Sequence, residues 1–134
     1  MKVISGYPPL IDKIDEVFHC KDQQVIYAWG DIIYQPFTFV IPNFLIAHEE
    51  VHGGRQGDDI EGWWKRYMED IEFRYQEELH AHAKEFQVRS RGVKDRNLKS
   101  QLLMWSAARL NAPLYGKMTN LNKAMKDIKA LQPA

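Results

Sequence analysis

The residues with the clearest chemical capability form the string Ala47-His48-Glu49-Glu50-Val51-His52, which fits the pattern H-E-x-x-H. On an α-helix, two residues four apart lie about 40° apart in projection and one turn along the same face. Both imidazoles can therefore reach one metal ion. Glu49 follows the first histidine and can hold and deprotonate a water molecule at that metal. The string predicts a Zn²⁺ site for hydrolysis, with His48 and His52 as ligands and Glu49 as general base.

The residues around the motif favour a helix with apolar surroundings. The apolar neighbours are Phe44, Leu45, Ile46, Ala47 and Val51, and only Glu50 projects away from His48. We expect two histidines and a glutamate on an otherwise buried helix to need partners, because buried polar groups without partners are costly. A metal ion with its water would satisfy all three. A pair of hydrogen-bonded core histidines, or a chance match to the pattern, is the alternative.

A catalytic zinc site also needs a third protein ligand and an open fourth position. Asp58 is one candidate, because it stands where the extended motif H-E-x-x-H-x-x-G-x-x-H/D has its last ligand. That motif needs glycine for a sharp turn at the position that Arg55 holds here. The departure makes Asp58 the weaker candidate.

Glu78 is the second candidate for the third ligand. At about 100° per residue, it lies at the edge of an inward, apolar helical stripe, with Arg74 and Glu85 close by on the same side. Glu77 lies well off this stripe. The stripe consists of Ile71, Tyr75, Leu79, His82 and Phe86. A carboxylate at the edge of the core, one helix away from two inward histidines, favours Glu78.

The combination resembles the gluzincin zinc metallopeptidases, in which H-E-x-x-H is followed on a later helix by E-x-x-A. Here His48-Glu49-x-x-His52 matches the first part and Glu78-Leu79-His80-Ala81 matches the second. The resemblance implies a zincin-like fold in which His48, His52 and Glu78 bind zinc. It also implies that Glu49 is the general base of a peptidase.

Two further positions belong to the resemblance. Ala81 matches a small residue that lets two helices of the family approach closely, and His82 stands where the family often has Asp or Asn. The chain is also similar to phage and prophage proteins that carry the motif, through Phe73-Arg74, Glu78-x-x-Ala81 and Leu110-x-x-Pro113-Leu114-Tyr115-Gly116. That similarity gives an alternative function, a virion structural or interaction protein that keeps the scaffold, assembles into a larger complex and does not hydrolyse peptides.

The expected reaction is hydrolysis of a peptide bond in a peptide or protein, and the same chemistry would serve on a peptidoglycan peptide. Glu49 would take a proton from the activated water and later pass it to the leaving amine. A further group would stabilise the developing oxyanion. The candidates are Tyr67, Arg74, Tyr75, His82 and Tyr115.

Periodicity and turn residues predict the elements that position these side chains. A short helix with Pro8-Pro9 in its first turn is expected to run to Phe18. Further helices are expected from Phe44 to His52 (closed by Gly53-Gly54), Trp63 to Arg91 (bent near Asp70), Leu98 to Leu110 and Leu121 to Leu131, with a loop over Gly57 to Gly62. Two β-rich runs, Gln24 to Trp29 and Ile32 to Ile41, are hinged at Gly30-Asp31. Pro36 places the second run at a sheet edge, where the part around Thr38 could align a substrate by strand addition. We predict an α+β class and a single minimal zincin-like domain over residues 1–134, with a small sheet or hairpin packed on the motif helix.

Composition narrows the function further. The chain of 134 residues has 18 Lys plus Arg and 18 Asp plus Glu, so we expect neither nucleic acid nor an anionic membrane as partner. Charges do not segregate strongly, although Arg89 to Arg96 and Lys117 to Lys129 lean basic. The lone Cys20 excludes an internal disulfide. Without a long apolar segment or a signal-peptide pattern, we expect a soluble protein, cytoplasmic in its cell or part of a virion if phage-encoded.

Overall fold

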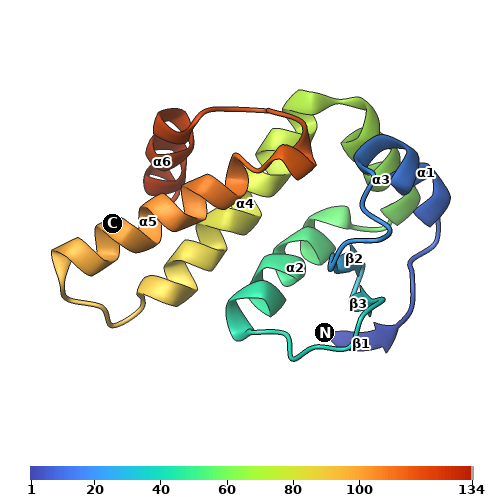
Figure 1. Cartoon of the computed structure of the whole chain (residues 1–134), viewed down its shortest axis with the longest axis horizontal. Helices are drawn as coiled ribbons and strands as arrows, with labels where there is room; N and C mark the ends of the chain where they lie inside the picture. The colour runs from blue at the N-terminus through green and yellow to red at the C-terminus, as the bar shows by residue number, and fades with distance from the viewer. Residues whose placement is uncertain (134) are drawn as a thin grey trace.

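The structure is a computed structural model that describes residues 1–133, so only Ala134 of the expected domain lies outside it. Within these residues it has six α-helices, one 3₁₀ turn and one three-stranded sheet, which confirms the α+β class (Figure 1). The helical elements are α1 (Ile11–Phe18), α2 (Asn43–Gln56), α3 (Ile60–Glu69), α4 (Ile71–Ser90), α5 (Arg96–Leu110), η1 (Pro113–Tyr115) and α6 (Leu121–Ala130). The strands are β1 (Lys2–Ser5), β2 (Tyr27–Trp29) and β3 (Ile32–Gln35). None of the helices in this described part is long and apolar enough to cross a bilayer.

The sheet confirms the predicted hairpin and adds a strand that the sequence pattern did not indicate. β2 and β3 pair antiparallel, with Trp29 opposite Ile32 across the Gly30-Asp31 turn. Gly30 has φ 62°, the positive value that the first position of a type II′ turn requires. β1 pairs with β3 in parallel and gives the strand order β1-β3-β2.

The predicted edge strand is therefore wrong. β3 is the central strand and ends at Gln35, so Pro36 and Thr38 follow the strand instead of belonging to it. The physical reason is that proline cannot donate a ladder hydrogen bond, and with neighbours on both sides the strand ends where that donor is missing. β2 is the edge strand next to the motif helix, and strand addition at Thr38 has no strand to extend.

Three helix predictions also need correction at their ends. α1 begins at Ile11, so Pro8-Pro9 precede the helix instead of forming its first turn. α2 does not close at Gly53-Gly54 but continues to Gln56. The predicted long helix is two helices, because the backbone of Asp70 is extended and its side chain caps α4 by accepting from the Phe73 N–H at 3.1 Å. α3 begins at Ile60, inside the expected loop, and is capped in the same way by Asp59.

Gly53 explains why α2 can lie so close to the hairpin. A Cβ atom at this position would overlap the backbone carbonyl oxygen of Gly30, whereas a Cβ at Gly54 would meet nothing within 4 Å. Gln56 fixes the same contact, because its amide donates to the Ala28 carbonyl at 2.9 Å and accepts from the Gly30 N–H at 2.6 Å. The hairpin is thus fastened to the C-terminal half of the motif helix.

We expect Gly53→Ala to lower the free energy of unfolding by about 1–3 kcal/mol, because a backbone group cannot move aside cheaply. Gly54→Ala is the matched control, one residue along the same helix. It should raise the free energy of unfolding by about 0.5–1 kcal/mol through its better helix propensity. Chemical denaturation of both variants measures the difference, and equal effects would contradict the close contact.

Two apolar clusters flank the central pair α2 and α4, which lie side by side in Figure 1. The first packs α4 against α5 and α6 through Tyr75, Leu79, Phe86, Leu110 and Ile128. The second packs α1, β2 and α3 through Ile14, Tyr27, Trp63, Trp64 and Tyr67. The contact between α2 and α4 is polar, and it contains the residues that the sequence singled out.

Candidate metal centre

The fully buried side chains of helix α2 are all polar, whereas its apolar ones are only half-buried. Its fully buried side chains are His48, Glu49, His52 and Gln56, while Phe44 and Val51 keep part of their surface in solvent. The expectation of a helix wrapped in apolar contacts is therefore wrong for this surface. Four buried polar side chains need partners or a ligand, since buried polar groups without them are costly.

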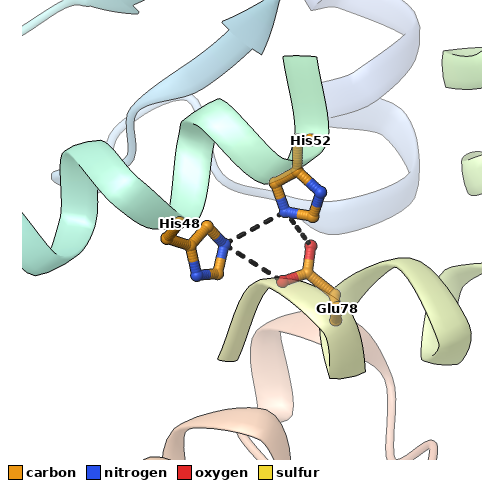
Figure 2. Close-up of side chains that lie close together, drawn as sticks. All are labelled: His48, His52 and Glu78. Carbon is orange, nitrogen blue, oxygen red and sulfur yellow. Dashed lines mark hydrogen bonds and ion pairs between the residues drawn. The ribbon is translucent and has the colours of Figure 1, made fainter. Parts of the chain in front are cut away.

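Three candidate donors meet between α2 and α4, as Figure 2 shows. The Nε2 atoms of His48 and His52 lie 3.0 Å apart. The carboxylate of Glu78 reaches both rings, with Oε1 3.3 Å from His48 Nε2 and Oε2 3.0 Å from His52 Nε2. All three residues are buried. The structure thus brings together the three residues that the sequence proposed as ligands.

Ion pairs between both histidines and Glu78 hold this triangle together, and its size is one that a zinc ion could also span. With zinc–ligand bonds of about 2.0–2.1 Å and tetrahedral angles, neighbouring donors lie roughly 3.3 Å apart. The observed separations of 3.0 to 3.3 Å are close to that value. The donor set, two imidazoles and a carboxylate, is one that zinc accepts in catalytic sites.

Glu78 is held in place from the opposite side by α3. The hydroxyl of Tyr67 donates to Glu78 Oε2 at 2.6 Å. Burial by itself would raise the pKa of Glu78, but the charge on His52 and hydrogen bonds from the histidines keep this pKa well below its ordinary value. The carboxylate is therefore ionised and oriented, as a metal ligand needs to be.

Behind His48 lies a charged pair that supports its ring. Glu85 Oε1 is 2.7 Å from His48 Nδ1, and Arg109 of α5 donates to both Glu85 oxygens at 2.9 and 3.0 Å. Burial works against a charged His48, yet Glu78 and Glu85 outweigh it and raise the pKa of this imidazole to about 10. A metal ion at Nε2 would have to displace the proton that this pKa favours, and Glu85 on Nδ1 would then hold the ring as carboxylates hold metal-binding histidines.

His48, His82 and Glu85 form a second group of close donors. This group suits a metal less well, because the guanidinium of Arg109 already lies against both oxygens of Glu85 and would repel a cation there. We therefore assign Glu85 to the support of His48. Nothing in the sequence linked Arg109 to the site, since α5 reaches it only through the tertiary fold.

Replacing Glu85 should weaken zinc binding without removing a ligand. We expect Glu85→Gln to raise the dissociation constant for zinc by about 10- to 100-fold, the usual effect of losing such a supporting carboxylate. Glu77→Gln is the matched control, since Glu77 is also buried on α4 and paired with an arginine, Arg55, at 2.6 Å. Competition with a chelator measures both constants, and an equal loss in the two variants would contradict the assigned role.

Asp58, the other candidate for the third ligand, does not join the donors, and two residues of α4 differ from their expected burial. Asp58 is exposed and belongs to neither group of close donors. Glu77, expected off the buried stripe, is in fact buried and accepts hydrogen bonds from Arg55 and Trp63. Ile71, expected on the stripe, is 56% exposed because α4 begins there, at the surface.

Two hollows that share lining residues lie beside Glu49. An inner cavity of about 80 Å³ is lined by all three donors and by aromatic side chains including Trp63 and Tyr67. An outer groove of about 370 Å³ shares His48, Glu49 and Tyr115 with it. Glu49 is the one acidic residue that lines both, and burial raises its pKa. Its carboxylate therefore faces the space that a water molecule and a substrate would enter.

The five candidates for oxyanion stabilisation separate clearly. Tyr75 donates to Asp127 at 2.6 Å and lines neither hollow. The guanidinium of Arg74 donates hydrogen bonds to the backbone carbonyls of Tyr67, Met68 and Tyr115. The hydroxyl of Tyr67 donates to Glu78. Tyr115 lines both hollows, with its hydroxyl 3.2 Å from His82 Nε2. Tyr115, backed by His82, is the candidate that the geometry favours.

Comparison of the chain with protein-family models, with curated proteins and with solved structures finds no match.

Proposed function

We propose that this protein is a zinc-dependent metallohydrolase, most simply a peptidase of the gluzincin type on a minimal zincin-like fold. The observation that carries the proposal is the convergence of His48, His52 and Glu78 on one point, with Glu49 facing the adjoining hollows. A closed structural site has no need of a buried glutamate beside its ligands. A hydrolytic site needs one as its base.

The roles of the chain's own residues follow from their surroundings. A zinc ion bound by the three donors would polarise the substrate carbonyl and lower the pKa of water. Glu49, whose own pKa is raised by burial, would accept a proton from that water and return it to the leaving amine. Tyr115 would donate its hydroxyl proton in a hydrogen bond to the carbonyl oxygen as negative charge develops there.

The outer groove suggests the substrate. Gln24 and Arg109 add polar groups to its lining, and its larger apolar side chains come from the segment before β2, the segment before α2, α2 itself and η1. These side chains are Val25, Ile26, Phe39, Leu45 and Leu114. We propose a peptide with an apolar side chain next to the cleaved bond. The peptide would lie along Gln24 to Ile26. It would not pair with β2 at Ala28, because the carbonyl oxygen of Ala28 already accepts hydrogen bonds from Gln56 and Trp64. A peptidoglycan peptide fits the same chemistry.

One observation favours a second candidate, a virion structural or interaction protein that keeps the metal site for stability. The three donors and Glu49 are each at most 7% exposed, and the inner cavity beside them holds only about 80 Å³. A site that buries its base this deeply admits a substrate less easily than an open cleft. Turnover therefore separates the two candidates, whereas zinc binding does not.

The first experiment is the zinc content of purified protein after equilibration with limiting zinc and desalting. The proposal expects about one zinc per chain, and a peptide library with Glu49→Gln as control then tests for hydrolysis. A protein that binds zinc and cleaves nothing would favour the structural candidate. A protein without zinc affinity would overturn both.

A further inference from the structure

A basic groove far from the metal donors opens where the C-terminal ends of α4 and α6 meet the start of α5. It has a volume of about 770 Å³, and Phe86, Val93 and Leu103 supply apolar side chains to its lining. Its charged lining residues are all cationic: Arg91, Arg96, Lys99 and Lys129. None of the four forms an ion pair with another residue in the range 1–133. The groove therefore offers an apolar contact ringed by unpaired positive charge.

Local helix stability accounts for only two of these four cations. Arg96 and Lys99 stand in the first turn of α5, where the helix dipole disfavours positive charge, and the only acidic group at that end is the N-cap Asp95, which is engaged with the backbone N–H groups of Asn97 and Leu98. Arg91 at the C-cap of α4 and Lys129 in the last turn of α6 have positions that the dipole favours. An external partner with negative charge would explain the arrangement.

The charges of the chain are also strongly segregated, contrary to the sequence-based expectation. Residues 1–72 carry 13 acidic and six basic side chains, whereas residues 73–134 carry five acidic and 12 basic ones. The neutral chain is thus an acidic half joined to a basic half. A molecule of this kind is complementary to a second copy of itself.

An acidic and apolar projection stands at the opposite end of α4, and we call it the knob (Glu69, Asp70, Ile71, Glu72). All four residues are exposed, and Ile71 leaves 56% of its surface in solvent. Asp70 is engaged in capping α4, which leaves Glu69 and Glu72 to carry the outward charge. An isoleucine between glutamates matches an apolar floor between arginines and lysines.

The knob and the groove lie at the two ends of one helix. α4 has 20 residues and so spans about 30 Å. In Figure 1 its junction with α3 lies at the top of the molecule, and its turn into α5 lies at the left. Contacts between opposite ends of identical molecules are head-to-tail, and they build chains or rings instead of closed two-fold dimers.

We propose that the groove at the α4–α5 turn binds the knob of a second copy of this chain. Ile71 of one molecule would cover the apolar floor, and Glu69 and Glu72 would pair with the arginines and lysines around it. A second copy is favoured over nucleic acid because the exposed apolar residue and the acidic charges sit together on the knob. The net charge of the whole chain is also zero, which disfavours binding to polyanions.

Sedimentation velocity at increasing protein concentration and two salt concentrations tests the proposal. Wild-type protein should associate at low salt and dissociate at high salt, because screening weakens surface charge pairs. Arg96→Glu with Lys99→Glu reverses the groove, and Glu69→Lys with Glu72→Lys reverses the knob. Each double variant alone should show a dissociation constant at least about tenfold higher.

An equimolar mixture of the two double variants provides the decisive arm. Each variant presents the charge that the other lacks, so the mixture should associate again although neither component does. A variant that had merely lost its fold would not be rescued in this way. A wild-type protein that stays monomeric at low salt would overturn the proposal. If that monomer bound a labelled oligonucleotide, the basic groove would instead be a nucleic-acid site. Association that survives in both separate variants would overturn it as well.

Discussion

Glu49→Gln is expected to keep about one zinc per chain and to lower kcat/KM for a peptide substrate by about 10²- to 10⁴-fold. Glutamine preserves the shape and burial of the side chain, but it cannot take a proton from water at neutral pH. The three candidate zinc donors are other residues, so metal content should not change. The variant thus separates chemistry from metal binding.

Glu50→Gln is the control for this variant. Glu50 is the next residue on α2, is exposed and lines neither hollow beside the metal donors. The same loss of one negative charge there should leave both zinc content and kcat/KM close to wild type. The measurement is steady-state hydrolysis of the best peptide from the library, with zinc determined on the same samples. Undiminished hydrolysis by Glu49→Gln would remove Glu49 as the base.

The sequence was sufficient to predict that the three donors lie together. Helical spacing puts His48 and His52 on one face, and the inward stripe of the later helix places Glu78 at the edge of the core. That these two helices meet was implied by the resemblance to the pattern H-E-x-x-H followed by E-x-x-A. That the three side chains bind zinc stays a prediction.

The parts of the site that depend on tertiary contacts were not predictable in the same way. Arg109 reaches Glu85 across 24 residues, and Tyr115 reaches His82 across 33. Only the packing of α5 and η1 against α4 creates these pairs. The parallel strand β1 was missed for a similar reason, since its partner β3 lies far along the chain and its own four residues carry little pattern.

The burial of α2 shows how a functional site can oppose the usual pattern. Hydrophobic periodicity predicts that apolar residues face the core, yet this helix turns its histidines and two other polar side chains inward. The free-energy cost of removing these polar groups from water is offset by the contacts of the histidines with Glu78 and Glu85 and by the hydrogen bonds of Gln56 to the hairpin. Conflicts of this kind between local pattern and fold are expected mainly at functional sites.

The second large effect is expected for Glu78→Gln, which should raise the dissociation constant for zinc by at least about 100-fold. Loss of a supporting carboxylate already costs about 10- to 100-fold, and loss of a charged donor should exceed that. The amide keeps the volume of the side chain and leaves Tyr67 a hydrogen-bond acceptor, so the fold should survive. Competition with a chelator of known affinity measures the constant.

Two control variants make this result specific to the donor position. Glu77→Gln changes the neighbouring buried glutamate, whose partners are Arg55 and Trp63, and Asp58→Ala changes the exposed position of the other candidate ligand. Both should bind zinc within about threefold of wild type, because neither side chain belongs to the donor triangle. If Asp58→Ala weakened zinc binding more than Glu78→Gln, the third ligand would come from the loop after α2. The metal centre would then have to form by a movement of that loop toward the two histidines.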